Sequence, residues 1–196
     1  MNLPNKLTLT RFVLVIVFAF FAFPLPDVLC PNALVRAWIA LIVYIVASIT
    51  DALDGHLARK NNMVTDFGKF LDPIADKLLV TSALLSLILV DTEGLFHGIY
   101  IWSTLIILTR EFMVSGVRMI AASKGVVIAA GKMGKLKMIF QTIAIIVLLT
   151  VPVFGGMFAE ILRLLGDILM IVAVILTIWS GAEYLWKNRT LFMQAK

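Results

Sequence analysis

The sequence alternates long apolar runs with short polar and basic segments, and this alternation restricts the fold more than any other feature. Hydrophobic residues make up 61% of the 196 residues, above the roughly 45–50% found in soluble domains. A transmembrane helix needs about 20 mainly apolar residues. We therefore predict an all-α integral membrane protein with six transmembrane helices in a single domain, residues 1–196. The expected spans are residues 10–23, 33–59, 65–90, 96–122, 138–153 and 161–186.

A short mixed segment, residues 2–10, precedes the first span. Leu3, Leu7 and Leu9 lie among polar residues there, a pattern typical of a helix that lies in the membrane interface. We therefore expect a short N-terminal interfacial helix before the first span. The apolar run that follows has no small-residue cleavage site, so we interpret it as a retained helix and not as a signal peptide.

The distribution of basic residues predicts the orientation. Six spans put both termini on one side of the membrane, and in this layout all of the 17 basic residues except Arg36 and Arg163 belong to that side. Basic residues favour the cytoplasm. We predict a multi-pass protein of the inner or plasma membrane, with both termini and the functional site cytoplasmic. Because orientation explains the net charge of +5, we predict membrane lipids as partners and no nucleic acid.

Four aspartates interrupt the apolar pattern at the cytoplasmic ends of the second and third spans. Asp51 and Asp54 are three residues apart and Asp72 and Asp76 four apart, so each pair shares one helix face. Each carboxylate would cost about 2.5–3.5 kcal/mol in a membrane helix. One or two Mg²⁺ or Mn²⁺ ions would offset this cost, since hard cations prefer oxygen ligands. We predict a metal site at these four residues. The alternative is ion pairing within the bundle to Arg59, Lys69 and Lys77.

The aspartates belong to a longer pattern. It reads Asp51-x-x-Asp54-Gly55-x-x-Ala58-Arg59, then eight residues, then Gly68-x-x-x-Asp72-x-x-x-Asp76. This pattern resembles the signature of the CDP-alcohol phosphotransferases, and the six-span layout is similar as well. Members of that family transfer a phosphatidyl group from a CDP-linked lipid to an alcohol and release CMP. The resemblance implies a metal-dependent phosphotransferase with CDP-diacylglycerol as donor, and a homodimer.

The small and basic residues of the pattern suit a bound nucleotide. Gly55, Ala58 and Gly68 would let CDP approach the helix backbones closely, although tight helix packing also uses small residues. Arg59 can bind a phosphate or the cytosine group through two parallel hydrogen bonds. We predict that these four residues bind the CDP-lipid.

Further roles follow only from the resemblance. It implies that Asp76 is the general base, which takes a proton from the acceptor hydroxyl, as well as a metal ligand. It also implies that Thr65 contacts the nucleotide, with a helix cap as the alternative. Asn5 and Thr8 resemble an N-terminal element that closes over the cytidine.

Basic residues on the fourth and fifth spans exceed what orientation requires. Arg110 and Arg118 are eight residues apart and share a helix face. Together with Lys135 they could bind a phosphate on the acceptor. Glu111 is adjacent to Arg110, but neighbouring side chains on a helix do not face each other. We therefore do not expect Glu111 to be the anionic partner of Arg110.

A phosphorylated acceptor points to sn-glycerol 3-phosphate. Four stretches resemble the family members that use this acceptor, namely residues 2–11, 70–78, 109–125 and 129–137. The resemblance implies phosphatidylglycerophosphate and CMP as products, in phosphatidylglycerol and cardiolipin biosynthesis.

Two other readings stay open. The first is a family member with another acceptor, such as inositol phosphate, serine or phosphatidylglycerol. The second is a cation- or proton-coupled transporter, although the carboxylates gather near one membrane face and not at the midplane. We assign Lys124 and Lys137 to a positive cytoplasmic loop with no further role.

Overall fold

The computed structural model describes residues 3–24, 32–61, 66–90, 97–126, 128 and 131–189. These residues form six long α-helices and one short 3₁₀ helix, which confirms the predicted all-α fold. The elements are α1 (Leu3–Ala22), α2 (Ala33–Asn61), α3 (Asp66–Val90), α4 (His97–Ser123), α5 (Lys132–Thr150), η1 (Val151–Val153) and α6 (Gly156–Lys187).

Within the described residues, three segments are long and apolar enough to cross a membrane. They are Ala33–Asp51 of α2, Lys132–Val153 of α5 and η1, and Gly156–Lys187 of α6. A shorter apolar helix, Leu9–Ala22, belongs to α1. Large apolar side chains such as Ile139, Ile143, Ile175 and Ile178 point outward. Hydrocarbon tails solvate such a surface well, so the helices form an integral membrane bundle.

The N-terminal segment differs from the prediction of a separate interfacial helix. Helix α1 runs without a break from Leu3 to Ala22, so the mixed residues form its first turns. Pro4 stands in the first turn, where a proline is tolerated because the amide hydrogen it lacks would have no partner there. The next proline is Pro24, and α1 ends two residues before it, at Ala22, since a proline disfavours helical geometry in the residue before it.

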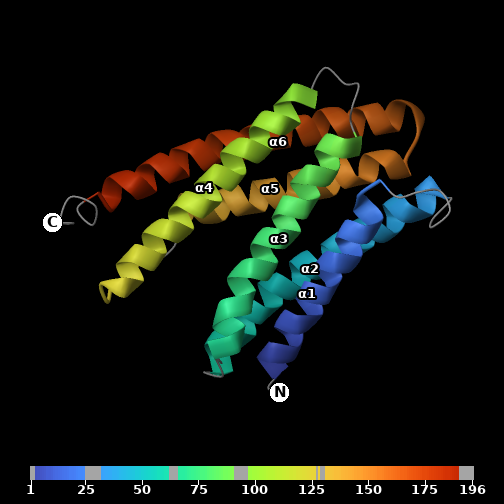
Figure 1. Ribbon diagram of the computed structural model, residues 1–196. Coiled ribbons are helices and arrows are strands. Elements are labelled where there is room, and N and C mark those ends of the chain that lie inside the picture. The colour runs from blue at the N-terminus through green and yellow to red at the C-terminus, as the bar shows by residue number, and fades with distance from the viewer. Residues whose placement is uncertain are drawn as a thin grey trace.

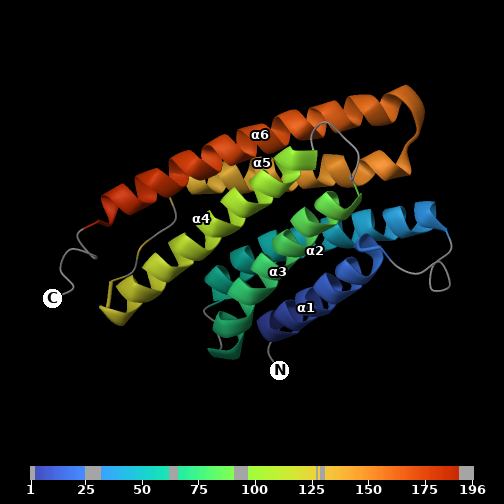
Figure 2. The same ribbon diagram turned by 45° about the horizontal axis from the view of Figure 1, so that its top comes forward.

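Successive helices run in alternating directions, so the start of α1 and the end of α6 lie toward the same end of the bundle (Figures 1 and 2). Helices α1, α2 and α3 form one group, and α5 and α6 form a long antiparallel pair. Helix α4 packs against both α3 and α6 and thereby connects the two groups.

One buried cluster joins all six α-helices. Aromatic packing contributes where Phe18 of α1 meets Tyr44 of α2, with ring centroids 5.5 Å apart. Small buried residues such as Ala47, Ala83 and Ala144 let the helix backbones approach closely. Near the start of α4, Tyr100 donates a hydrogen bond to the buried Asp167 of α6. The core therefore fixes the relative positions of the helices that carry the charged residues described below.

Gly166 of α6 sets the spacing of the α5–α6 pair. A Cβ atom at this position would lie 2.5 Å from Cδ2 of Leu148 on α5. We expect Gly166→Ala to destabilise the protein by about 1–3 kcal/mol through overpacking. Thermal unfolding of the detergent-solubilised protein measures this. Gly116→Ala is the control, because a Cβ there would meet nothing within 4 Å. If Gly166→Ala is as stable as Gly116→Ala, the two helices do not need this close approach.

Candidate functional site

The predicted donor and metal residues that the structure describes lie in the second half of α2, in the first half of α3 and near the start of α1. Thr65 falls outside the described residues. For eight others the structure describes the helix backbone but not the side chain: Asn5, Thr8, Asp54, Gly55, Ala58, Arg59, Gly68 and Asp72. Their predicted contacts therefore stay predictions.

Asp51 and Asp76 do have described side chains, and they line one cavity of about 240 Å³. One comes from α2 and the other from α3, so the structure brings together one carboxylate of each predicted pair. Both helices are continuous here, which puts Asp54 one turn after Asp51 and Asp72 one turn before Asp76.

These carboxylates fit a divalent cation. Carboxylate oxygens from two helices meet at one cavity, and Mg²⁺ and Mn²⁺ prefer such hard oxygen ligands. Among the described side chains, fewer than three His, Cys, Asp or Glu residues gather at any point. Because the side chains of Asp54 and Asp72 lie outside that part of the structure, the four-residue metal site stays a prediction.

A buried arginine contacts the same region from α1. Nη1 of Arg11 lies 2.8 Å from Oδ1 of Asp51, and the Arg11 side chain is almost completely buried. The sequence analysis counted Arg11 only as a cytoplasmic flank, and that interpretation was incomplete. Arg11 shares one helix face with the core residues Val15 and Phe18, a spacing of four and seven residues that could have indicated its burial.

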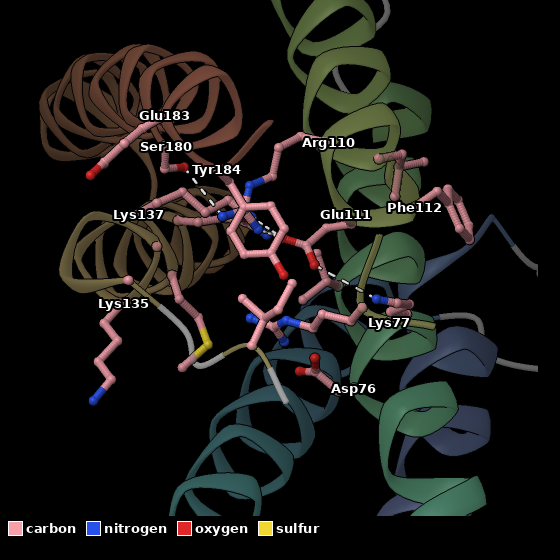
Figure 3. A pocket seen from close by; sticks show the side chains of 18 of the residues that line it. Asp76, Lys77, Arg110, Glu111, Phe112, Lys135, Lys137, Ser180, Glu183 and Tyr184 are labelled. Atoms are coloured by element: carbon pink, nitrogen blue, oxygen red, sulfur yellow. Dashed lines mark hydrogen bonds and ion pairs between the residues drawn. The ribbon is translucent and has the colours of Figure 1, made fainter. Parts of the chain in front are cut away.

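A second cavity, of about 520 Å³, lies between α3, α4, α5 and α6 (Figure 3). Arg110, Arg118 and Lys135 all line it, and so does Asp76. The three residues predicted to bind the acceptor phosphate are thus brought together beside the predicted general base. Asp76 borders both cavities, so it stands between the predicted donor and acceptor regions.

The charge of this cavity favours an anion. Its lining includes six basic and three acidic side chains, a formal net charge of +3. Positive clefts with apolar walls attract anions because the low-dielectric walls concentrate the field. Arg118 lies over the ring of Tyr184, with its guanidinium carbon 5.9 Å from the ring centroid. Lys135 is exposed, and its ammonium group points away from the Arg110 side chain (Figure 3).

Glu111 is the anionic centre of the cavity, which the sequence analysis did not predict. Its Oε1 atom lies 2.7 Å from Nζ of Lys137 and 3.1 Å from Nη1 of Arg110. Its Oε2 atom lies 3.8 Å from Nζ of Lys77. The expectation that Arg110 and Glu111 do not meet was wrong. Adjacent Cβ atoms point about 100° apart, but these two long side chains bend toward one cavity.

Lys137 was also misassigned. We predicted a loop residue, but it lies in the second turn of α5 and its side chain is only 3% exposed. It continues the buried face of α5 formed by Gln141, Ala144 and Leu148. That spacing of four, seven and eleven residues is a helical signal that could have identified it.

Two glycines make room for Arg110. A Cβ atom on Gly134 of α5 would lie 3.2 Å from Nη2 of Arg110, and one on Gly181 of α6 would lie 3.1 Å from its Cγ atom. Nη2 of Arg110 also donates a hydrogen bond of 3.3 Å to Ser180 Oγ. The guanidinium is therefore held by residues from both α4 and α6.

Apolar helices that bring carboxylates to a cavity, with a basic cavity beside them, are what the sequence pattern led us to expect of a membrane phosphotransferase. The chain belongs to the CDP-alcohol phosphatidyltransferase family, whose model matches residues 1–179. This confirms the predicted family.

The relatives are more specific. The chain is 41% identical to the CDP-diacylglycerol–glycerol-3-phosphate 3-phosphatidyltransferase of Bacillus subtilis (strain 168), over 192 residues that cover 95% of both chains. A protein of the same name from Rickettsia typhi is 37% identical over 97% of this chain and 99% of its own length. A probable phosphatidylglycerophosphate synthase from Mycobacterium tuberculosis (strain H37Rv) is 38% identical over 93% of this chain and 79% of its own length.

Proposed function

We propose that the protein transfers the phosphatidyl group of CDP-diacylglycerol to sn-glycerol 3-phosphate, which gives phosphatidylglycerophosphate and CMP. The observation that carries this proposal is the near full-length similarity to transferases that are named for this donor and acceptor. The basic cavity beside Asp76 supports it, because this acceptor carries a phosphate group. The product is a precursor in phosphatidylglycerol and cardiolipin biosynthesis.

On the donor side, Asp51, Asp54, Asp72 and Asp76 would hold one or two Mg²⁺ or Mn²⁺ ions. When bound, these ions would supply positive charge to offset the charge of the pyrophosphate. The remaining donor-binding residues of the proposal are Asn5, Thr8, Gly55, Ala58, Arg59, Thr65 and Gly68. Arg59 neutralises phosphate or contacts the cytosine group, and the small residues leave room beside the helix backbones.

On the acceptor side, Arg110, Arg118 and Lys135 bind the phosphate of glycerol 3-phosphate and direct its hydroxyl toward Asp76. The hydroxyl oxygen forms a bond to the phosphorus of the phosphatidyl group, and the bond from that phosphorus to the CMP oxygen breaks. Asp76 accepts the proton that the hydroxyl loses. Binding both substrates at adjacent sites replaces an encounter in solution by a local reaction, which accounts for much of the rate.

The proposed membrane arrangement follows the sequence analysis. Six helices span the inner or plasma membrane, with the first turns of α1 near the cytoplasmic interface. Both termini and the site face the cytoplasm, residues 1–196 form one domain, and the protein is a homodimer. The concentration of basic residues in the segments that this layout assigns to one side of the membrane supports this orientation.

An acceptor panel tests the proposed function. We expect purified protein with CDP-diacylglycerol and Mg²⁺ to release CMP when glycerol 3-phosphate is added. Glycerol, which lacks the phosphate, is the matched control and should give little CMP. Release of CMP only with inositol phosphate, serine or phosphatidylglycerol would assign a different acceptor. Failure to release CMP with any acceptor would favour a transporter.

A further inference from the structure

Glu111 stands at the centre of a cavity that should attract an anion. It lies on α4 between basic residues of α3 and α5, and its side chain is 24% exposed. A carboxylate in a phosphate-binding cavity repels the ligand, so by Coulomb's law alone its removal should strengthen binding. Its presence therefore calls for another explanation.

The contacts of Glu111 supply one. The carboxylate lies within 4 Å of basic groups on Lys77, Arg110 and Lys137, so it ties α3, α4 and α5 together at the cavity wall (Figure 3). All three basic residues line the cavity. Without an anion nearby, three cations this close would repel one another and spread apart.

Two further observations indicate that the cations are held ready for a ligand. Nε of Arg110 is buried and has no hydrogen-bond partner within the described part of the chain. Arg110 uses Nη1 for Glu111 and Nη2 for Ser180, so the plane of its guanidinium is fixed by contacts on two sides. Lys77 is fixed in the same way, since its ammonium also donates a hydrogen bond of 2.6 Å to Ser115.

We propose that Glu111 is a positioning residue for the acceptor. Its carboxylate orients Arg110, Lys137 and Lys77 so that their remaining N–H groups meet the phosphate of the acceptor, and Lys137 and Lys77 are further phosphate contacts. Glu111 itself touches neither the phosphate nor the reacting hydroxyl. This inference rests on the proposed function of the cavity and extends it to three residues without a previous role.

The variant Glu111→Gln tests the proposal, because positioning and net charge predict opposite results. Removing one negative charge should lower the KM for glycerol 3-phosphate if only the field of the cavity matters. If Glu111 orients the cations, the KM should rise about tenfold, since a misaligned bond to a charged group loses most of its strength. The kcat and the KM for CDP-diacylglycerol should change little, because the acceptor phosphate does not react.

Glu183→Gln is the matched control. Glu183 lines the same cavity but pairs with the exposed Lys187 on its own helix, so this variant removes the same charge without releasing Arg110 or Lys137. We expect its KM for glycerol 3-phosphate to stay the same or to fall. Glu111→Asp keeps the charge on a side chain that is one methylene shorter, and it should give a KM between those of the wild type and Glu111→Gln.

A second measurement does not depend on turnover. Addition of glycerol 3-phosphate, or of inorganic phosphate, should raise the Tm of the wild type more than that of Glu111→Gln. If Glu111→Gln does not fold, Glu111→Asp carries both measurements. A wild-type or lower KM in the variant, together with an unchanged Tm shift, overturns the positioning role. If the wild type binds these ligands but releases no CMP, the proposed function fails while the positioning role stands. If it binds neither ligand, both fail.

Discussion

Asparagine in place of Asp54 or Asp72 is expected to lower the rate of phosphatidyl transfer by about a thousandfold. A bound metal stabilises the transition state by several kcal/mol, and each loss of about 1.4 kcal/mol slows the reaction tenfold. The substitution removes a ligand charge but keeps the shape of the side chain. The rate of CMP release measures the effect on transfer. Titration with Mn²⁺, followed by electron paramagnetic resonance, measures metal binding independently and should show weaker binding in both variants.

Asp51 needs a different design because of its ion pair with Arg11. Asp51→Asn would leave the buried guanidinium without this counter-ion, so a loss of activity could reflect unfolding. Arg11→Met separates the two effects, because it breaks the pair and keeps the carboxylate. We expect Arg11→Met to lower the Tm and to retain metal binding, and Asp51→Asn to lose both stability and metal binding.

Removal of the metal provides the decisive control. Transfer by the wild type should stop in excess chelator and resume when Mg²⁺ is added back. Turnover at the wild-type rate in excess chelator would contradict the metal site altogether. Full Mn²⁺ binding by Asp54→Asn and Asp72→Asn would assign these residues a role other than metal ligand.

The helices were predictable because a membrane helix must satisfy its own backbone hydrogen bonds over a long apolar run. The ends of the helices were less predictable, because a run of apolar residues marks only the part of a helix that lies inside the hydrocarbon core of the membrane. Helix α5 begins at Lys132, six residues before the predicted span, since its first turns carry Lys132, Lys135 and Lys137. The predicted end at residue 153 coincides with η1, whose Pro152 cannot continue an α-helix.

The candidate site likewise contains residues that the sequence could predict and residues that it could not. The spacing of Asp51 and Asp76 within the pattern was sufficient to predict that they meet, because both stand on continuous helices joined by a short connection. Glu111 was not predictable from spacing. A rule about neighbouring Cβ directions does not cover long side chains, whose ends can converge from adjacent positions. Its contacts with Lys77 and Lys137 also depend on the packing of three helices, which no local pattern contains.

The basic residues of the acceptor cavity should control the KM for glycerol 3-phosphate. A hydrogen bond to a charged group contributes about 1.5–3 kcal/mol, so Arg110→Ala and Arg118→Ala should each raise this KM about tenfold to a hundredfold. The KM for CDP-diacylglycerol should move little, because the acceptor phosphate does not take part in the reaction. Arg110→Lys should give an intermediate value, since lysine keeps the charge but lacks the planar pair of donors.

The geometry also predicts how the effects of replacing Arg110, Arg118 and Lys135 on the KM for glycerol 3-phosphate should rank. Arg110 is mostly buried and held at Glu111 and Ser180, so it should have the largest effect. Lys135 is exposed and points away from Arg110, and Lys135→Ala should have the smallest. Lys132→Ala is the control for charge alone, because Lys132 begins the same helix but does not line the cavity. Steady-state kinetics with each substrate varied in turn separates these cases. Two results would show that the acceptor binds elsewhere: a rise in KM for Lys132→Ala as large as that for Arg110→Ala, or a wild-type KM in all three cavity variants. The basic cluster would then serve only membrane orientation and contact with anionic lipid.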